Sequence, residues 1–306
     1  MKPRACPPER RTPGMGREVV PCSVSVILSA LNESAVIGNL VARIRELYPD
    51  FEIIVVNDGS EDETAQVALE AGAFVYSHPY TIGNGAAVKS GIRIASGEVL
   101  VLMDGDGQHR PEDIPRLLQY LPEFDMVVGA RCRCQQTNWL RAAGNRLFNC
   151  LASYVTRFEV QDLTSGFRAV KSETAKDFLN LLPNAYSYPT TITLAVLHSG
   201  RSLKYEPIDV LKRRTGKSGV HCVEDGIRFL LILMKVCTLF APLRVFLPTS
   251  IAMFLAGLGC TLWTFLTADR FNNMGALFLT TSILIFMLGL VSEQISQMRF
   301  NGSAGP

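Results

Sequence analysis

Two long uncharged stretches near the C-terminus restrict most strongly what this chain can fold into. Val245–Leu266 is a run of 22 residues without a charge, Met274–Val291 is another of 18, and only Thr267–Asn273 separates them. A helix of about 22 residues is about 33 Å long, which matches the ~30 Å hydrocarbon core of a bilayer. The sequence therefore predicts a hairpin of two transmembrane helices. Two buried core helices of a soluble protein are the alternative, which the short polar link disfavours.

Basic residues flank this hairpin on both sides. Arg228, Lys235 and Arg244 precede it, and Arg299 follows it. Lysine and arginine accumulate on the cytosolic side of membrane spans, so both ends of the hairpin are expected in the cytosol. The segment Val223–Phe240 is apolar apart from a narrow charged face, which is typical of a helix lying in the membrane interface. A helix packed beneath a globular domain is the competing interpretation.

The rest of the chain has the composition of an ordinary globular domain. Of the 306 residues, 48% are hydrophobic and 19% are charged, which excludes a disordered chain and a collagen-like fibre. The net charge of +2 lacks the basic excess of a dedicated nucleic-acid-binding protein, so no nucleic acid is expected as a partner. The 8 cysteines include no C-x-x-C pair and the 4 histidines no ligand spacing, so neither structural zinc nor a disulfide framework is expected.

Between a polar N-terminal tail and the apolar C-terminal part, strands and helices alternate. Residues 1–22 are rich in proline and arginine without an apolar run, which predicts a disordered tail and not a signal peptide. Helices are expected to end near residues 47, 71 and 95. Strands are expected at Val24–Leu28, Ile53–Val56, Phe74–Tyr76, Val99–Met103 and Met126–Gly129. This alternation predicts an α/β fold with a mostly parallel sheet, helices on both faces, and ligands at the carboxyl ends of the strands.

The sequence Asp-Gly-Asp-Gly at 104–107 directly follows the expected strand Val99–Met103. Two carboxylates one residue apart at a strand end can hold a hard divalent cation, and the cation can neutralise a diphosphate. The loop does not fit an EF-hand, because His109 stands where the glycine is required and Pro115 where the final glutamate is required. A plain surface turn is the competing interpretation, since aspartate and glycine are common turn residues.

A second polar motif, Asn-Asp-Gly-Ser at 57–60, follows the expected strand Ile53–Val56. Asn/Asp–Gly pairs often make hairpin turns, but the residues that follow have a helical pattern and not that of a partner strand. A carboxylate fixed at a strand end suits recognition of a base or a ribose. Gly83 and Gly85 do not form a dinucleotide fingerprint, because Val88 occupies the place of the third glycine or alanine. The chain also lacks the G-x-x-x-x-G-K-S/T pattern.

Taken in order, these motifs resemble the family 2 glycosyltransferases of the GT-A fold, above all the dolichol- or polyprenyl-phosphate sugar synthases. The resemblance covers residues 23 to about 220. The matching stretches are 31–33, 55–64, 104–112, 128–131, 162–168 and 213–218. The resemblance implies a nucleotide-sugar donor linked to UDP or GDP, Mg²⁺ or Mn²⁺ as cofactor, and an undecaprenyl or dolichyl phosphate acceptor. Membrane lipid is a further implied partner, and a homo-oligomer is allowed.

The resemblance assigns roles residue by residue. Donor-side roles fall on Glu33, Val56, Asp58, Asp104, Gly105, Asp106 and Gln108. Of these, Glu33, Val56 and Asp58 are implied to hold the nucleoside, whereas Asp104 and Asp106 are implied to bind the metal.

Four further positions concern the phosphates and the acceptor. Arg131 and Arg141 correspond to basic positions near the diphosphate or the acceptor phosphate, and Arg213 is implied to close over phosphates. Asp162 begins the acceptor-side motif. Asp106, Arg131 and Asp162 are the expected catalytic residues.

The implied reaction is an inverting transfer, in which an acceptor oxygen attacks the anomeric carbon as the nucleoside diphosphate leaves. A polyprenyl phosphate is the expected acceptor, at the cytosolic face of a multi-pass membrane protein. A GT-A enzyme acting on a glycan or another lipid, and a non-catalytic membrane protein that keeps the fold, are the alternatives. Both metal-binding aspartates are retained, which disfavours the second alternative. The expected segments are a tail (1–22), the catalytic domain (23–211), a basic loop with the interfacial helix (212–243), the hairpin (244–295) and a tail (296–306).

Overall fold

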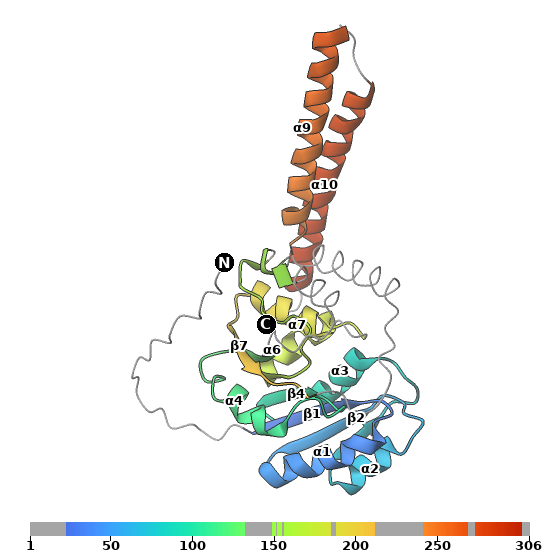
Figure 1. Ribbon diagram of the computed structural model, residues 1–306, viewed down its shortest axis with the longest axis vertical. Helices are drawn as coiled ribbons and strands as arrows, with labels where there is room; N and C mark the ends of the chain where they lie inside the picture. The colour runs from blue at the N-terminus through green and yellow to red at the C-terminus, as the bar shows by residue number, and fades with distance from the viewer. Residues whose placement is uncertain are drawn as a thin grey trace, which may run out of the picture.

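The computed structural model describes residues 23–131, 149–150, 152–154, 156–184, 188–211, 241–268 and 273–301. Figure 1 shows an α/β domain from which two long helices extend side by side. The predictions for Arg141, Arg213 and the interfacial helix Val223–Phe240 lie outside the described residues, as do those for the tail 1–22.

A seven-stranded sheet forms the centre of the domain, in the order β3-β2-β1-β4-β6-β5-β7. Its strands are β1 (Val24–Ala30), β2 (Glu52–Asn57), β3 (Phe74–Ser77), β4 (Val99–Asp104), β5 (Met126–Arg131), β6 (Arg168–Lys171) and β7 (Leu203–Ile208). Neighbouring strands are parallel, except that β6 runs antiparallel to both β4 and β5. The predicted mostly parallel sheet and its five expected strands are confirmed, whereas β6 and β7 were not predicted.

The reversed direction of β6 matters for the position of the site. Arg168, the first residue of β6, pairs with Leu102 near the end of β4 and with Val128 of β5. The loop that precedes β6 therefore arrives at the same edge of the sheet where β1, β2, β4 and β5 end. Residues far apart in the sequence are gathered at this edge.

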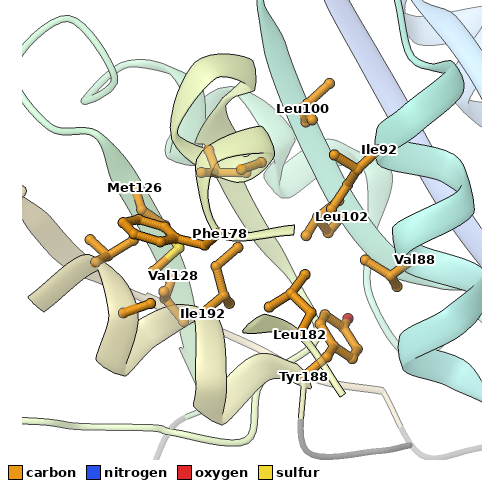
Figure 2. Close-up of a cluster of buried hydrophobic side chains, with 14 of the residues drawn as sticks. Val88, Ile92, Leu100, Leu102, Met126, Val128, Phe178, Leu182, Tyr188 and Ile192 are labelled. Carbon is orange, nitrogen blue, oxygen red and sulfur yellow. The ribbon is translucent and has the colours of Figure 1, made fainter. Parts of the chain in front are cut away.

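Helices cover both faces of the sheet, as predicted. They are α1 (Ser34–Leu47), α2 (Thr64–Glu70), α3 (Asn84–Ile94), the 3₁₀ turn Pro111–Asp113, α4 (Ile114–Leu118), α6 (Ser172–Asp177), the 3₁₀ turn Leu179–Leu181 and α7 (Tyr188–His198). One hydrophobic cluster packs α1, α2 and α4 on one face, and another packs α3, α6 and α7 on the other. Figure 2 shows the second cluster, in which Val88 of α3, Leu102 of β4 and Ile192 of α7 meet. Because both faces are covered, the inner strands are continuous apolar runs.

Two apolar helices follow, α9 (Pro242–Ala268) and α10 (Asn273–Asn301). Both are long and apolar enough to cross a membrane, and only 11% and 17% of the residues in their apolar stretches are buried. The buried core helices of a soluble protein would show the opposite, so that alternative is wrong. The predicted pair of apolar C-terminal helices is confirmed. Gly289 of α10 allows their close approach, because a Cβ there would lie 2.7 Å from Phe246 Cβ.

The base of this hairpin is built into the domain. Ala241 belongs to the hydrophobic cluster of α3, α6 and α7, and Val245 in the first turns of α9 packs against it. Tyr154 and Arg244 exchange hydrogen bonds through their side chains and main-chain oxygens, each at 3.5 Å. Glu293 of α10 accepts a bond from the N–H of Leu243 at 3.3 Å, which satisfies one of the free donors at the start of α9. The α/β domain and the hairpin therefore share one packed junction.

Candidate active site

The start of α1 is held by side chains of the loop that follows β2. The backbone N–H groups of residues 32–34 donate to Ser60 Oγ at 2.9 Å, Thr64 Oγ1 at 2.9 Å and Asp62 Oδ2 at 3.1 Å, in that order. The N–H groups of Glu33 and Ser34 are unpaired donors at the helix N-terminus, so Thr64 and Asp62 cap α1 from a distance, and Ser60 fixes the residue before the cap. These three contacts are called the clasp. Ser60, Asp62 and Thr64 belong to the stretch 55–64 that matches the family in the sequence, and the clasp gives these three residues a structural role.

We expect Asp62→Ala to lower the stability of the domain at pH 7 by about 1 kcal/mol, the usual cost of a lost helix cap. Burial raises the pKa of Asp62, but hydrogen bonds from Thr64 and Ser34 outweigh burial and lower it to about 2. Because this pKa lies below that of the unfolded chain, near 4, the clasp contributes fully above pH 4 and loses its contribution as the pH falls toward 2. Thermal unfolding of both proteins between pH 2.5 and 7 measures the effect.

Asp50→Ala, at an exposed turn position before β2, is the matched control and is expected to match the wild-type protein at every pH. Equal unfolding midpoints for Asp62→Ala and wild type at pH 7 would show that the clasp contributes nothing.

Asp58 stands directly after β2 and organises the connection that leads to α3. Its Oδ1 is 2.7 Å from His78 Nδ1 and accepts the N–H of Ile82 at 3.0 Å, while its Oδ2 accepts the N–H of Gly83 at 2.8 Å. Only 3% of Asp58 is exposed, so these bonds are made away from water. A role in holding the nucleoside stays a prediction, and the structure adds a second role in fixing the loop 78–83.

The other two residues implied to hold the nucleoside are placed differently. Glu33 is buried at the start of α1, where its carbonyl oxygen accepts the N–H groups of Val36 and Ile37 at 3.0 and 2.9 Å. The Val56 side chain is fully buried in the cluster beneath α3. The structure thus gives Val56 a position in the core and not on the surface of the site.

Asp104 is the last residue of β4, and a hydrogen bond joins it to the end of the loop 78–83 that Asp58 fixes. Asn84, next to Gly83, donates from Nδ2 to Asp104 Oδ1 at 3.3 Å. On the other side Gly166 packs so closely that a Cβ there would overlap Asp104 Oδ2. Burial raises the pKa of Asp104, against the lowering effects of the Asn84 hydrogen bond and of the Arg168 and Arg131 charges. Such a partly buried carboxylate is suited to a cationic partner.

The next three residues, 105–107, make a tight turn whose first and last positions have no room for a side chain. The N–H of Gly105 donates to Ser29 O at 2.8 Å, and a Cβ there would lie 2.9 Å from the same oxygen. Gly107 has φ +69°, and its Cβ would meet Val36 Cγ1 at 2.5 Å. Within the turn, Asp106 Oδ1 accepts the N–H of Gln108 at 3.1 Å. The competing interpretation as a plain surface turn does not explain why this turn packs against β1 and α1.

The donor set fits Mg²⁺ or Mn²⁺ bound together with a substrate. Among the described residues no three His, Cys, Asp or Glu side chains gather into a metal cluster, so a metal held at this turn would rely on the two predicted ligands, Asp104 and Asp106, and on the substrate. Mg²⁺ is usually held by one or two carboxylates, with waters and substrate phosphates completing its shell. Two oxygen ligands at a strand end match this pattern and do not match a resident metal with an all-protein shell.

Arg131 ends β5 and forms a bidentate ion pair with Asp162. Nε and Nη2 of Arg131 donate to the two carboxylate oxygens at 2.8 and 3.0 Å, and the N–H of Thr164 also donates to Asp162 at 3.1 Å. Burial raises the pKa of Asp162, but the Arg131 hydrogen bond and charge outweigh it and hold this pKa below its usual value. Asp162 is thus ionised at neutral pH and orients Arg131 more readily than it removes a proton. The sequence predicted both residues and missed their pairing.

Two further features surround the Asp104–Gln108 turn. His109 is 7% exposed and stacks on Phe167 with ring centroids 5.1 Å apart, and burial lowers its pKa to about 4, so it is neutral at pH 7. The N–H of Leu211 donates to Gln108 O at 2.9 Å, so the segment after β7, two residues before Arg213, lies against the turn. A cleft of about 770 Å³ opens here between α1 and the turn, lined by residues that include Val36, Asn39, Arg43, His109, Arg110 and Leu211.

Known proteins share both the sequence pattern and the fold. An undecaprenyl-phosphate 4-deoxy-4-formamido-L-arabinose transferase of Aeromonas hydrophila is 26% identical over 92% of this chain and 91% of its own length. An undecaprenyl-phosphate mannosyltransferase of Micrococcus luteus is 28% identical over 64% of this chain and 86% of its own length.

Among solved structures, glucosyl-3-phosphoglycerate synthase of Mycobacterium tuberculosis has the same fold. Its complex with phosphoglyceric acid aligns with a TM-score of 0.58 at 22% identity, covering 71% of this chain and 80% of that one. Its complex with Mn²⁺, UDP and phosphoglyceric acid aligns with a TM-score of 0.56 at 23% identity, covering 70% and 78%.

Family models match both parts of the chain. The model of the GtrB C-terminal hairpin matches residues 241–298, which contain α9 and α10. The model of glycosyl transferase family 2 matches residues 25–179, half of the chain and most of the domain that carries Asp104, Asp106, Arg131 and Asp162. With its mostly parallel sheet, its two aspartates where β4 ends and its apolar hairpin, the chain belongs to glycosyl transferase family 2 and is a glycosyltransferase.

Proposed function

We propose that this protein transfers a sugar from a nucleotide-sugar donor to a polyprenyl phosphate at the cytosolic face of a membrane, with inversion and with Mg²⁺ or Mn²⁺. The observation that carries this proposal is the meeting of the Asp104–Asp106 turn with the Arg131–Asp162 pair at one edge of a sheet whose domain is joined to an apolar hairpin. Relatives named for undecaprenyl-phosphate transfer, and a neighbour crystallised with Mn²⁺ and UDP, support it.

On the donor side, Asp104 and Asp106 would hold the divalent cation together with the sugar diphosphate. The cation supplies stabilisation of the negative charge that develops on the leaving diphosphate. Asn84 and Gly166 keep Asp104 in one position, and the clasp at the start of α1 keeps the neighbouring loops in register. The protein would thus supply a carboxylate pair whose first member, Asp104, is held in place by its neighbours.

On the acceptor side, Arg131 is oriented by Asp162. Among the contacts of the described residues, Nε and Nη2 of Arg131 bond to Asp162, and Nη2 also bonds to Thr164 Oγ1, while a third of the Arg131 side chain is exposed. The exposed part of the side chain would face the acceptor phosphate. A phosphate monoester has a second pKa of about 6 and is mostly dianionic at pH 7, so it attacks without a strong general base. The low pKa of Asp162 agrees with this role.

The hairpin gives the proposal its membrane geometry. Two spans and the basic residues around them favour a cytosolic catalytic domain with both ends of the hairpin in the cytosol. A lipid phosphate cannot leave the headgroup layer cheaply, since each exposed CH₂ of its chain costs about 0.8 kcal/mol. The active site must therefore act at the membrane surface, and Arg141, Arg213 and the segment Val223–Phe240 are proposed to meet the acceptor there.

The proposal is tested with purified protein in lipid nanodiscs, a panel of UDP- and GDP-linked sugars, and undecaprenyl phosphate. We expect one donor to give a glycosylated polyprenyl phosphate in a reaction that EDTA stops, with inverted anomeric configuration by NMR. Undecaprenol, which lacks the phosphate, is the control acceptor and is expected to stay unmodified. Transfer to a glycan acceptor alone would favour the alternative of a polysaccharide-forming enzyme.

A further inference from the structure

Arg168 carries a positive charge into the interior of the domain. It begins β6 between β4 and β5, and its side chain is 0% exposed. Of the ion pairs among the described residues, none includes Arg168. Burying an arginine without a carboxylate in contact is costly, and apolar side chains of similar size often give a more stable core. Stability alone therefore does not account for an arginine at this position.

The guanidinium ties the loop before β6 to the first turns of α7. Nη1 donates to Pro189 O at 3.0 Å and to Thr193 Oγ1 at 3.2 Å, and Nη2 donates to the main-chain oxygen of Ser165. Thr193 Oγ1 in turn donates to Pro189 O at 2.8 Å. The fork geometry of arginine makes these bonds in two directions at once, which the single ammonium of lysine does not reproduce.

The loop that Arg168 holds contacts both halves of the site. At its start, Asp162 forms the ion pair with Arg131, and near its end Gly166 packs against the carboxylate of Asp104. A shift of this loop would therefore move the acceptor-side pair relative to the donor-side aspartate. The guanidinium lies over the Tyr188 ring, and among the described residues neither the buried Arg168 Nε nor the Tyr188 hydroxyl has a hydrogen-bond partner, so the cluster is not arranged to satisfy every polar atom within that part of the chain.

We propose that Arg168 is a positioning residue that sets the distance between Asp104 and the Arg131–Asp162 pair, and thereby directs the sugar to the acceptor phosphate instead of to water. This inference rests on the proposed function. Reacting groups displaced by about 1 Å can lose about 100-fold in rate, although each substrate still binds. Loss of the fork should consequently impair transfer more than it impairs donor binding.

The experiment compares Arg168→Lys with the wild-type enzyme in nanodiscs. Its readouts are the kcat of transfer, the KM of the donor, the rate of donor hydrolysis, and Mn²⁺ binding followed by electron paramagnetic resonance in the presence of nucleoside diphosphate. We expect kcat of transfer to fall at least about 30-fold, while donor KM and Mn²⁺ affinity change less than about threefold. The ratio of hydrolysis to transfer should rise. Arg201→Lys is the matched control, since Arg201 bonds to Thr174 and Asp177 and not to the loop, and it should keep wild-type values.

Two results would overturn the inference: wild-type transfer by Arg168→Lys, or transfer and hydrolysis reduced in equal proportion. If Arg168→Lys does not fold, Thr193→Val removes one acceptor of the guanidinium and should raise the hydrolysis-to-transfer ratio at least about threefold, and an unchanged ratio would likewise overturn the inference. A wild-type enzyme that hydrolyses donor but never glycosylates polyprenyl phosphate would instead contradict the proposed function.

Discussion

Asp104→Asn is expected to lower turnover at least about 100-fold, the loss seen when a group that stabilises developing negative charge is removed. Asparagine keeps the size of the side chain and one acceptor oxygen, so the bond from Asn84 and the contact with Gly166 persist. The negative charge toward a divalent cation and one ligand oxygen are lost. Asp106→Asn should have an effect of the same order, because the protein offers the metal these two carboxylates.

Initial rates over a titration of Mn²⁺ measure this prediction, since a weakened metal site needs more metal for half-maximal rate. Asp113→Asn is the matched control: Asp113 lies in the 3₁₀ turn that follows the loop and bonds to Arg116 on the surface. That variant should keep the wild-type rate. Full activity of Asp104→Asn in the presence of EDTA would refute the metal site.

The second large effect is expected at the Arg131–Asp162 pair. Asp162→Asn and Arg131→Met should each lower turnover at least about 100-fold, because the first leaves the partly exposed Arg131 without the carboxylate that orients it and the second leaves the buried Asp162 without its cation. The double variant should be little worse than either single one, since both singles disrupt one unit. A double-mutant cycle on kcat tests this. Additive losses would show that the two residues act independently.

The same pair makes a prediction about pH. Because the pKa of Asp162 lies below its usual value, the Asp162 carboxylate stays ionised as the pH falls from 8 to 5. It is protonated, and the ion pair with Arg131 is lost, only below the ordinary pKa range of aspartate. The pH profile of turnover between 5 and 8 should therefore have the same shape in the wild-type enzyme and in Asp162→Asn, although the variant is slower throughout. The acceptor phosphate, with its second pKa of about 6, is the group expected to titrate there.

Much of the sheet could be predicted because its inner strands are buried on both faces. The apolar runs of β1, β2 and β4 stand out from any background, and each ends in a polar motif. By contrast, β6 has only four residues and begins with the buried Arg168, so its composition hides it. The outermost strand, β7, contains Lys204, Glu206 and Pro207. An edge strand tolerates charged residues and proline, but such a composition does not indicate a strand in the sequence.

The residues of the site were easier to predict than the contacts between them. Asp104 and Asp106 could be predicted because they directly follow an apolar strand. The Arg131–Asp162 pair joins residues 31 positions apart, and it forms because the antiparallel β6 returns the chain to the same edge. The clasp on α1 likewise needs the register of β1 against β2. Such contacts depend on topology, which local patterns do not encode.

The junction at the base of the hairpin has a mechanical meaning. Ala241 and Val245 continue the core of the domain into α9, and Glu293 fastens α10 to the same turn. In a bilayer this junction would hold the domain in a fixed position and not on a flexible linker. The distance of the active site from the membrane surface would then be set by the fold. Under the proposed function, a domain mounted in this way would meet the acceptor phosphate at a fixed height above the membrane, whatever the length of the prenyl chain.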